Sequence, residues 1–293
     1  MAGFAKSFIF ILAVSAGFLA VLWRDTFDSV EQLLSGAPVL LTGASKGIGE
    51  QMAYHYVRFG VITARNEARL KQVEEKCLEL GAKKVYSVLV DMADPKHAEE
   101  VVQYALEKLG SLNYLVLNHI GSDPFQMWNR NAEQTGWVQQ VNFLSDVQPT
   151  SAALSTLIKS NGSIVVVSSV CGKIATPYLA SYAASKFALD GFFSSLRREL
   201  AMQERNVSIT LCILGLIDTE SAMEKIQVGF VGWTPYPASE AALAIIKGGA
   251  TRAREIYYPW WTAIAVSARG WFPAIRDKMV RSSYQQKGKE VRD

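Results

Sequence analysis

Short apolar runs alternate with longer amphipathic stretches along most of the chain from Pro38 onward. The runs are rich in β-branched residues and are bounded by Gly, Asn and polar residues, a pattern typical of strands. Predicted strands lie at 39–41, 61–64, 85–90, 114–117, 163–168 and 208–214. Predicted helices lie between them at 48–58, 67–80, 95–109, 134–159 and 182–204. The alternation predicts an α/β, Rossmann-type fold, a single domain with a doubly wound parallel sheet.

Composition fits one folded domain and narrows its chemistry. The 293 residues are 49% hydrophobic and 19% charged, enough apolar material for a sizeable core and too few charges for global disorder. A net charge of +3 is too balanced to indicate a nucleic-acid partner. Cys77, Cys171 and Cys212 have no metal-ligand spacing and form no disulfide framework, so no metal is expected and we interpret them as packing residues.

An uncharged segment at 7–23 precedes the predicted fold. It is just long enough to span a bilayer as a helix. Lys6 comes before it and net negative charge follows at 24–31, which predicts a cytoplasmic N-terminus and a lumenal remainder. We expect 1–24 to be an uncleaved anchor in the endoplasmic reticulum membrane, followed by a linker at 25–37. A cleaved signal peptide, giving a secreted protein, and a buried core helix are the alternatives.

Two Asn-x-Ser sequons support exposure in the secretory pathway. Asn161 and Asn206 each lie in a polar patch just before an apolar, strand-like run, where a glycan would project from the surface. Either sequon alone is a weak signal. Because both agree with the charge asymmetry around the anchor, we expect a lumenal glycoprotein.

A glycine-rich loop at 42–49 (TGASKGIG) joins the first predicted strand to the first helix. Its glycines permit a tight turn, and the helix N-terminus offers free N–H groups to phosphates. The order of strand, glycine-rich loop and helix predicts dinucleotide binding. The second strand ends in Arg65 rather than in the acid that binds a ribose 2′-hydroxyl. Arg65 and Lys46 can pair with a 2′-phosphate, which predicts NADP(H), although Arg65 could also be a solvated loop charge.

Tyr182 and Lys186 lie four residues apart and share one face of a predicted helix. A nearby ammonium lowers the pKa of a phenol, so Tyr182 can exchange a proton with a carbonyl or alcohol oxygen. Ser169 follows a strand and can bind the substrate oxygen; Ser168 is the alternative, but alternation points it to the other face. Asn142 is a candidate to hold a relay water for Lys186, or simply a polar residue that bends a helix.

Together these motifs resemble the short-chain dehydrogenase/reductase superfamily, whose marks are TGxxxGxG, an Asn, a Ser and YxxxK. The resemblance covers about 38–254. Within the superfamily the chain is similar to the type 1 branch of the 11-beta-hydroxysteroid dehydrogenases, and most closely to its type 1-like (type 3) proteins. The stretches that carry this likeness are 42–49, 117–120 (LNHI), 161–169 (NGSIVVVSS), 186–195, 214–220 (LGLIDTE), 248–252 and 257–260.

The resemblance implies that Ser169, Tyr182 and Lys186 are catalytic, with Asn142 in the relay. It also implies cofactor contacts from the glycine-rich loop, from the ends of the next three strands and from a segment that closes over the nicotinamide. These residues are Gly43, Ala44, Ser45, Lys46, Gly47, Ile48, Gly49, Arg65, Asn66, Asp91, Met92, Asn118, His119, Ile120, Ile217, Asp218, Thr219, Glu220 and Ser221, together with Tyr182 and Lys186. His119 replaces an alanine of the common motif, and we interpret it as structural rather than as a base.

Two departures from the family pattern bear on the site. Gly60 is followed at once by 61–65, with fewer residues between that glycine and the arginine than the family has. This spacing predicts a short second strand or an unwound preceding helix, and a displaced Arg65. The steroid-facing segment 173–179 also differs from the type 1 enzyme, with Thr176 in place of a tyrosine, which weakens the case for a glucocorticoid substrate.

The C-terminal segment 256–293 follows the predicted catalytic domain, 38–255, and is aromatic and basic. It could contact lipid as an interfacial segment, pack across a homodimer, or cover the domain's own core. Residues 285–293 are expected to be a disordered polar end.

The combined expectation is an NADP(H)-dependent oxidoreductase that interconverts a hydroxyl and a ketone on a lipophilic, steroid-like substrate. We also expect association with a membrane through the N-terminal segment, and a homodimer. A retinoid or xenobiotic carbonyl reductase on the same scaffold is the narrower alternative. A weakly active, cofactor-binding secreted or membrane protein is the alternative from another class. The presence of Asn142, Ser169, Tyr182 and Lys186 favours an enzyme.

Overall fold

The computed structural model describes Leu34 and residues 36–56, 59–121, 123–226, 234–271 and 273–284. The chain divides into two units, Met1–Ser35 and Gly36–Asp293. The expected anchor at 1–24 and the polar end at 285–293 lie outside the described residues. Among the residues that are described, no helix is long and apolar enough to cross a membrane.

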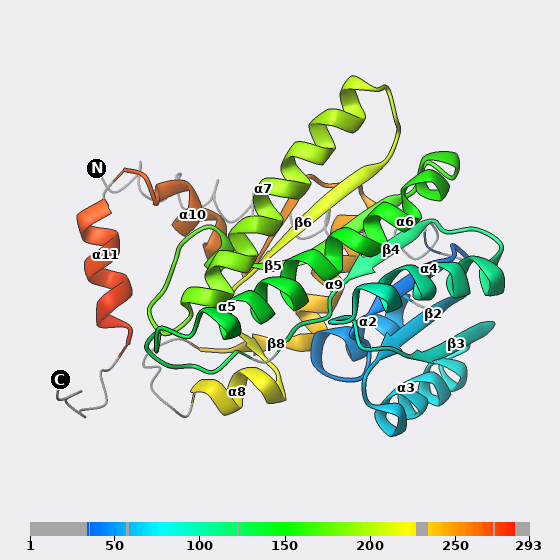
Figure 1. The fold of residues 1–293 in the computed structure, drawn as a ribbon, viewed down its shortest axis with the longest axis horizontal. Coiled ribbons are helices and arrows are strands. Elements are labelled where there is room, and N and C mark those ends of the chain that lie inside the picture. Colours follow the sequence, from blue (N-terminus) through cyan, green and yellow to red (C-terminus); the bar gives the residue numbers. More distant parts are fainter. Residues whose placement is uncertain are drawn as a thin grey trace, which may run out of the picture. The chain divides into compact units, whose positions relative to one another are not determined.

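A parallel sheet forms the centre of the second unit (Figure 1). Within the described residues it has seven strands in the order β3-β2-β1-β4-β5-β6-β9. The chain runs outward from β1 in one direction and from β4 in the other, so the strand order reverses between these two. A crevice opens at such a reversal, beyond the carboxyl ends of the strands. The strands are β1 Val39–Thr42, β2 Phe59–Ala64, β3 Lys84–Leu89, β4 Tyr114–Leu117, β5 Ser163–Ser169, β6 Ser208–Leu214 and β9 Glu255–Tyr258.

Helices cover both faces of this sheet, which confirms the predicted Rossmann-type fold. One face carries α2 (Gly47–Tyr56), α3 (Glu67–Glu79) and α9 (Ala238–Ala250). The other carries α4 (Pro95–Leu109), α6 (Ser145–Lys159) and α7 (Ala180–Met202). The remaining elements are α5 (Ala132–Gln139), β7 (Ile217–Asp218), α8 (Glu220–Ile226), β8 (Tyr236–Pro237), α10 (Trp261–Ala268) and α11 (Pro273–Ser282).

The predicted helix at 134–159 is not one regular helix. A π-helical turn at Gln140–Leu144 separates α5 from α6, and Pro149 lies inside α6. The spacing of apolar residues does not reveal this turn. One extra residue rotates the apolar face of the helix that follows, but apolar residues still recur along the chain on both sides of it. The turn contains Asn142, a predicted site residue.

The second strand is not short. It begins at Phe59, has six residues and pairs with β3 along its whole length. Gly60 therefore belongs to the strand, paired with Val39 of β1, instead of preceding it. Of the two alternatives expected from the spacing, the shortened strand is wrong. The preceding helix, α2, is described as far as Tyr56, and its predicted last positions, 57 and 58, lie outside the described residues. Arg65 directly follows the carboxyl end of β2.

The last strand, β9, was not predicted. It pairs with β6 at the edge of the sheet, from Glu255 to Tyr258. Its four residues are all half-buried and begin with a charged side chain, so their sequence lacks the continuous apolar run of the inner strands. The domain boundary expected at 255 falls at the start of this strand.

Phe193 of α7 lies in the core between the helix and the sheet and is completely buried. We expect Phe193→Ala to lower the free energy of unfolding by about 3–5 kcal/mol, because the lost ring leaves a cavity in a closely packed interior. Urea unfolding measures this change. Met202→Ala, at the exposed end of the same helix, is the control, and its free energy of unfolding should stay close to that of the unmodified protein. Equal losses of stability for the two substitutions would contradict the burial of Phe193 in the core.

Candidate active site

A cavity of about 940 Å³ lies at the carboxyl ends of the central strands. Its lining brings together most of the residues expected at the site. They are Gly43, Ser45, Lys46, Gly47, Ile48, Gly49, Arg65, Asn66, Asp91, Met92, Asn118, His119, Ile120, Ser169, Tyr182, Lys186, Ile217, Thr219, Glu220 and Ser221. Three expected residues are not in this lining: Ala44 and Asn142 are buried beside it, and Asp218 is exposed.

The glycine-rich loop is folded tightly against the end of β4. Gly43 and Gly47 have positive φ angles of 67° and 59°, which side chains rarely tolerate. A Cβ on Gly49 would lie 2.0 Å from the Gly43 carbonyl oxygen. The Asn118 side chain donates to the carbonyl oxygens of Thr42 and Gly43 at 3.2 and 3.0 Å. The loop is thus fixed from behind, which leaves the N-terminus of α2 open toward the cavity.

Cationic side chains gather where this loop meets the end of β2. Lys46 and Arg65 are there as expected, and Arg69 of α3 joins them. Glu220, at the start of α8, accepts from Arg69 at 2.7 Å and lies 3.6 Å from the Lys46 ammonium. Arg69 was not predicted, although its place in the first turn of the helix that follows Arg65 was an available signal.

Tyr182 and Lys186 face the cavity from the first turns of α7. The Lys186 ammonium lies 5.8 Å from the centroid of the Tyr182 ring and donates to the Val167 carbonyl oxygen at 3.0 Å. Burial raises the pKa of Tyr182, and a hydrogen bond with Ser169 opposes this shift. Burial lowers the pKa of Lys186. Ser169, at the end of β5, thus meets the Tyr182 hydroxyl as its expected role requires.

Ser168 also borders the cavity, so strand alternation alone does not separate the two serines. Its hydroxyl is buried and has no hydrogen-bond partner among the described residues, whereas Ser169 Oγ accepts from the Cys171 amide at 3.1 Å. Only Ser169 is linked to Tyr182.

Asn142 lies in the π-helical turn, a feature that often marks functional sites. Its side-chain oxygen accepts from the Gly121 amide at 2.8 Å, and its amide nitrogen is buried without a hydrogen-bond partner among the described residues. The residue is completely buried. The π-helical turn agrees with the interpretation of Asn142 as a polar residue that bends the helix. Its role in a relay to Lys186 stays a prediction.

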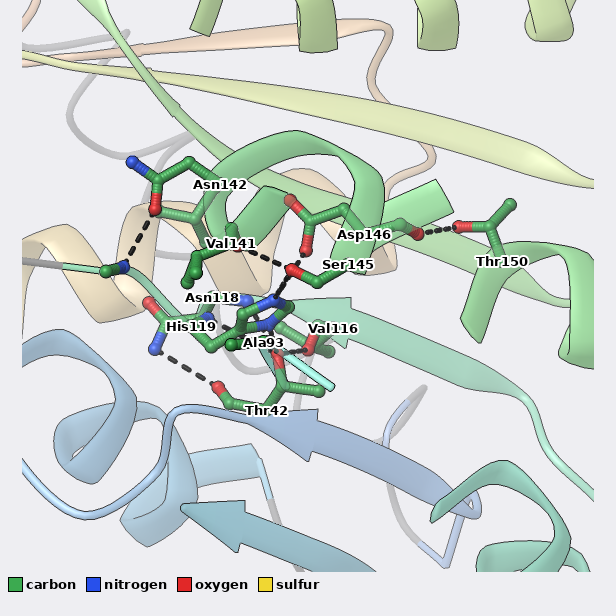
Figure 2. Close-up of polar contacts among 12 residues, drawn as sticks. Thr42, Ala93, Val116, Asn118, His119, Val141, Asn142, Ser145, Asp146 and Thr150 are labelled. Atoms are coloured by element: carbon green, nitrogen blue, oxygen red, sulfur yellow. Dashed lines mark hydrogen bonds and ion pairs between the residues drawn. The ribbon is translucent and has the colours of Figure 1, made fainter. Parts of the chain in front are cut away.

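His119 is buried and contacts its surroundings through both ring nitrogens (Figure 2). Nδ1 lies 2.9 Å from the Thr42 hydroxyl, and Nε2 lies 2.5 Å from the Ser145 hydroxyl. Asp146 Oδ1 is 3.5 Å from Nε2. Burial, with smaller effects of Lys186 and Arg65, lowers the pKa of His119 to about 3, so the ring is neutral at physiological pH. Nothing in the sequence marked Ser145 or Asp146 as neighbours of this histidine.

The end of the cavity away from the glycine-rich loop is largely apolar. It is formed by side chains from α10 and α11, with Phe125, Leu179 and Tyr284. The rings of Phe125, Tyr178 and Tyr284 stack, with centroids 5.2 to 6.1 Å apart. The C-terminal segment therefore packs on its own domain, one of the three roles considered for it.

Both sequons lie in exposed turns before β5 and β6, at the edge of the sheet opposite the cavity. Arg252 donates to the Asn161 carbonyl oxygen at 2.8 Å and to the Asn206 side-chain oxygen at 2.9 Å. Cys77, Cys171 and Cys212 are buried free thiols, as their interpretation as packing residues requires.

Comparison with known proteins identifies relatives of this chain. A family model described as short chain dehydrogenase matches residues 37–229. The chain is 63% identical to the hydroxysteroid 11-beta-dehydrogenase 1-like protein of Gallus gallus over 254 residues, 84% of this chain and 88% of the relative. It is 55% identical to the protein of that name in Danio rerio over 280 residues, 94% and 96% of the two chains. It is 52% identical to the protein of that name in Homo sapiens over 222 residues, which are 75% of this chain and 70% of the relative.

We expect Gly49→Ala to lower the free energy of unfolding by about 1–3 kcal/mol, because the methyl group has no room against the Gly43 carbonyl. Gly191→Ala in the exposed part of α7 is the matched control. No atom lies within 4 Å of its added methyl group, and we expect it to stabilise the protein by about 0.5–1 kcal/mol. Thermal unfolding measures both variants, and we expect the melting temperature to fall for Gly49→Ala and to rise for Gly191→Ala. A Gly49 variant as stable as the Gly191 variant would show that the loop is not packed this tightly.

Proposed function

The chain belongs to the short chain dehydrogenase family, and from this we propose that it is an NADP(H)-dependent oxidoreductase that interconverts a hydroxyl and a ketone on a steroid-like substrate. The family is one of oxidoreductases that act on CH–OH groups with a nicotinamide cofactor. One observation carries the proposal: the phosphate-binding loop and the Ser169, Tyr182 and Lys186 side chains line the same cavity.

The residues at the loop fit a dinucleotide. Gly43 and Gly49 keep the backbone free of side chains where a pyrophosphate would approach, and α2 begins there. Arg65, Lys46 and Arg69 supply positive charge where the 2′-phosphate of NADP(H) would lie, and the end of β2 has no acid to select NAD(H). Glu220 would compete with the phosphate for Arg69 and Lys46.

When bound, the nicotinamide supplies or accepts the hydride. The chain's own residues hold the substrate oxygen and move its proton. Ser169 is positioned to donate a hydrogen bond to that oxygen, and Tyr182, kept protonated by burial, gives it a proton during ketone reduction. The Lys186 ammonium stabilises the phenolate that remains. Alcohol oxidation uses the same groups in reverse.

The apolar end of the cavity supports a lipophilic substrate. α10 and α11 contribute Trp261, Ile264, Ile275 and Met279 to it, and the relatives' name refers to hydroxysteroids. Thr176 also borders this end, so the side chain that differs from the type 1 pattern is placed to affect substrate choice. NADPH consumption with a panel of ketosteroids, retinoid aldehydes and xenobiotic carbonyls tests the substrate class.

The cellular setting rests on the sequence. We propose an anchor at 1–24 in the endoplasmic reticulum membrane, a lumenal catalytic domain with glycans at Asn161 and Asn206, and a homodimer.

We expect Tyr182→Phe to reduce turnover by a factor of about 10² to 10⁴, because it removes the proton donor and leaves the ring. NADPH binding, followed by fluorescence, should stay near that of the unmodified protein. Tyr104→Phe on α4, away from the cavity, is the matched control and should retain full turnover. Turnover by the Tyr182 variant equal to that of this control would refute the mechanism.

We expect Arg65→Ala to weaken NADPH binding about tenfold to hundredfold and to leave NADH binding unchanged, because only NADPH carries the 2′-phosphate. Cofactor titration by fluorescence measures both affinities. Arg198→Ala, on the exposed surface of α7, removes the same charge away from the cavity and should change neither. Equal losses for NADPH and NADH would contradict the role of Arg65.

A further inference from the structure

Lys173, Asp190 and Glu255 form an ion cluster that does not belong to the lining of the cavity. The Lys173 side chain is only 8% exposed, and its ammonium lies 2.6 Å from Asp190 Oδ1 and 2.9 Å from Glu255 Oε1. Breaking a buried ion pair is costly, because the remaining charge is left uncompensated. The cluster therefore holds together the three elements from which its members come.

The two carboxyl groups depend on Lys173 to different degrees. Asp190 Oδ1 is buried and has no hydrogen-bond partner among the described residues, so the ion pair with Lys173 is its compensation. Glu255 also accepts from the Tyr257 hydroxyl. Burial raises the pKa of Glu255, but the hydrogen bonds from Tyr257 and Lys173 outweigh this and lower it, so this carboxyl group is ionised at neutral pH. Loss of Lys173 would thus leave an uncompensated carboxylate on α7.

Asp190 places the cluster on the face of α7 that carries the proposed catalytic pair. Tyr182, Lys186 and Asp190 follow one another at intervals of four residues, so they share one face of the helix. The ion pair of Lys173 with Asp190 therefore ties Lys173 to the helix face from which proton transfer is proposed.

The turn before Lys173 packs against the same helix. This 3₁₀ turn, Val170–Gly172, directly follows β5. A Cβ on Gly172 would lie 2.7 Å from the Lys186 carbonyl oxygen, so the turn and α7 are in direct contact. The Lys173 amide donates to the Val170 carbonyl oxygen at 2.9 Å, which closes the turn. Lys173 is thus held near α7 by its backbone as well as by its ammonium.

Lys173 begins the first wall of the apolar end of the cavity. The segment 173–179 follows the turn, and Ile174, Thr176 and Leu179 from this segment line the cavity. The place of this wall relative to α7 therefore depends on how Lys173 is fixed.

Glu255 connects the cluster to the second wall, α10. It is the first residue of β9, which leads through Pro259 into α10. Thr262 of α10 is completely buried, and its hydroxyl donates to the Pro259 carbonyl oxygen at 2.7 Å, so the joint between strand and helix is fixed. Trp261 and Ile264 of α10 line the cavity.

We propose that Lys173 is a positioning residue for the substrate, whose ion pairs with Asp190 and Glu255 fix both walls of the apolar end relative to the proposed catalytic pair. Lys173 acts through these walls and touches neither substrate nor cofactor. Its effect on the substrate rests on the proposed function, whereas its effect on the two walls does not.

The effect on the walls is tested without turnover by hydrogen–deuterium exchange followed by peptide mass spectrometry. In Lys173→Met, which keeps the length of the side chain and removes its charge, we expect the amides of 174–179 and of α10 to exchange at least about tenfold faster, because the contacts that hold both walls are lost. Strands β1 and β4 should keep the exchange rates of the unmodified protein. Lys173→Arg retains the charge and should restore much of the protection.

Arg197→Met is the matched control. Arg197 is also on α7, donates to the Ile209 and Arg254 carbonyl oxygens at 3.0 and 2.9 Å, and does not border the cavity. Its loss also removes buried contacts of α7, but the exchange of the two walls should not change. If Lys173→Met does not fold, it is replaced by the double variant with Asp190→Asn, which leaves no unpaired carboxylate on α7.

The effect on the substrate is tested by NADPH consumption with progesterone, a ketosteroid large enough to reach the apolar end, and with acetophenone, a small ketone. In Lys173→Met, kcat/KM for progesterone should fall about tenfold or more through a higher KM, because displaced walls misplace the ketone. The value for acetophenone and the affinity for NADPH should change little, and Arg197→Met should alter none of these quantities.

Unchanged exchange in the two walls, or equally faster exchange throughout the domain, would overturn the proposal. Faster exchange confined to the walls, with an unchanged ratio of progesterone to acetophenone turnover, would overturn the role in substrate selection. Absence of turnover with either ketone in the unmodified protein would contradict the proposed function, since exchange would still decide whether Lys173 fixes the walls.

Discussion

A buried ammonium ion is the constraint on which this site depends. The proposed mechanism requires Lys186 to lie close to Tyr182, and that position is almost completely shielded from water. A hydrogen bond to the Val167 carbonyl oxygen, 3.0 Å away, offsets part of the cost of burying this charge.

The motifs that sequence analysis identified are local. The glycine-rich loop and the Tyr182–Lys186 spacing depend on residues within one turn or one strand–loop–helix unit, so their geometry follows from their order. The contacts that were missed join distant parts of the chain. Arg69 meets Glu220 across 151 positions, and His119 meets Ser145 across 26. Spacing along the chain carries no information about such pairs.

The error about β2 has a different origin. The family has more residues between this glycine and the arginine, so the spacing from Gly60 to Arg65 predicted a short strand or an unwound preceding helix. Parallel pairing does not require this, because backbone hydrogen bonds accept any residue with an N–H and a carbonyl. Phe59 and Gly60 join the strand, β2 keeps six residues, and Arg65 remains next to the loop. The edge strand β9 was missed for a related reason, since its pairing with β6 is not accompanied by an inner strand's apolar run.

The two ends of the cavity are built by different parts of the sequence. Loops after β1, β2 and β4 form the polar end, and Ser169 and α7 supply the side chains proposed to transfer the proton. Most of the apolar end comes from α10 and α11, beyond the last strand. Changes in these two helices can therefore alter the substrate without moving Tyr182 or Lys186.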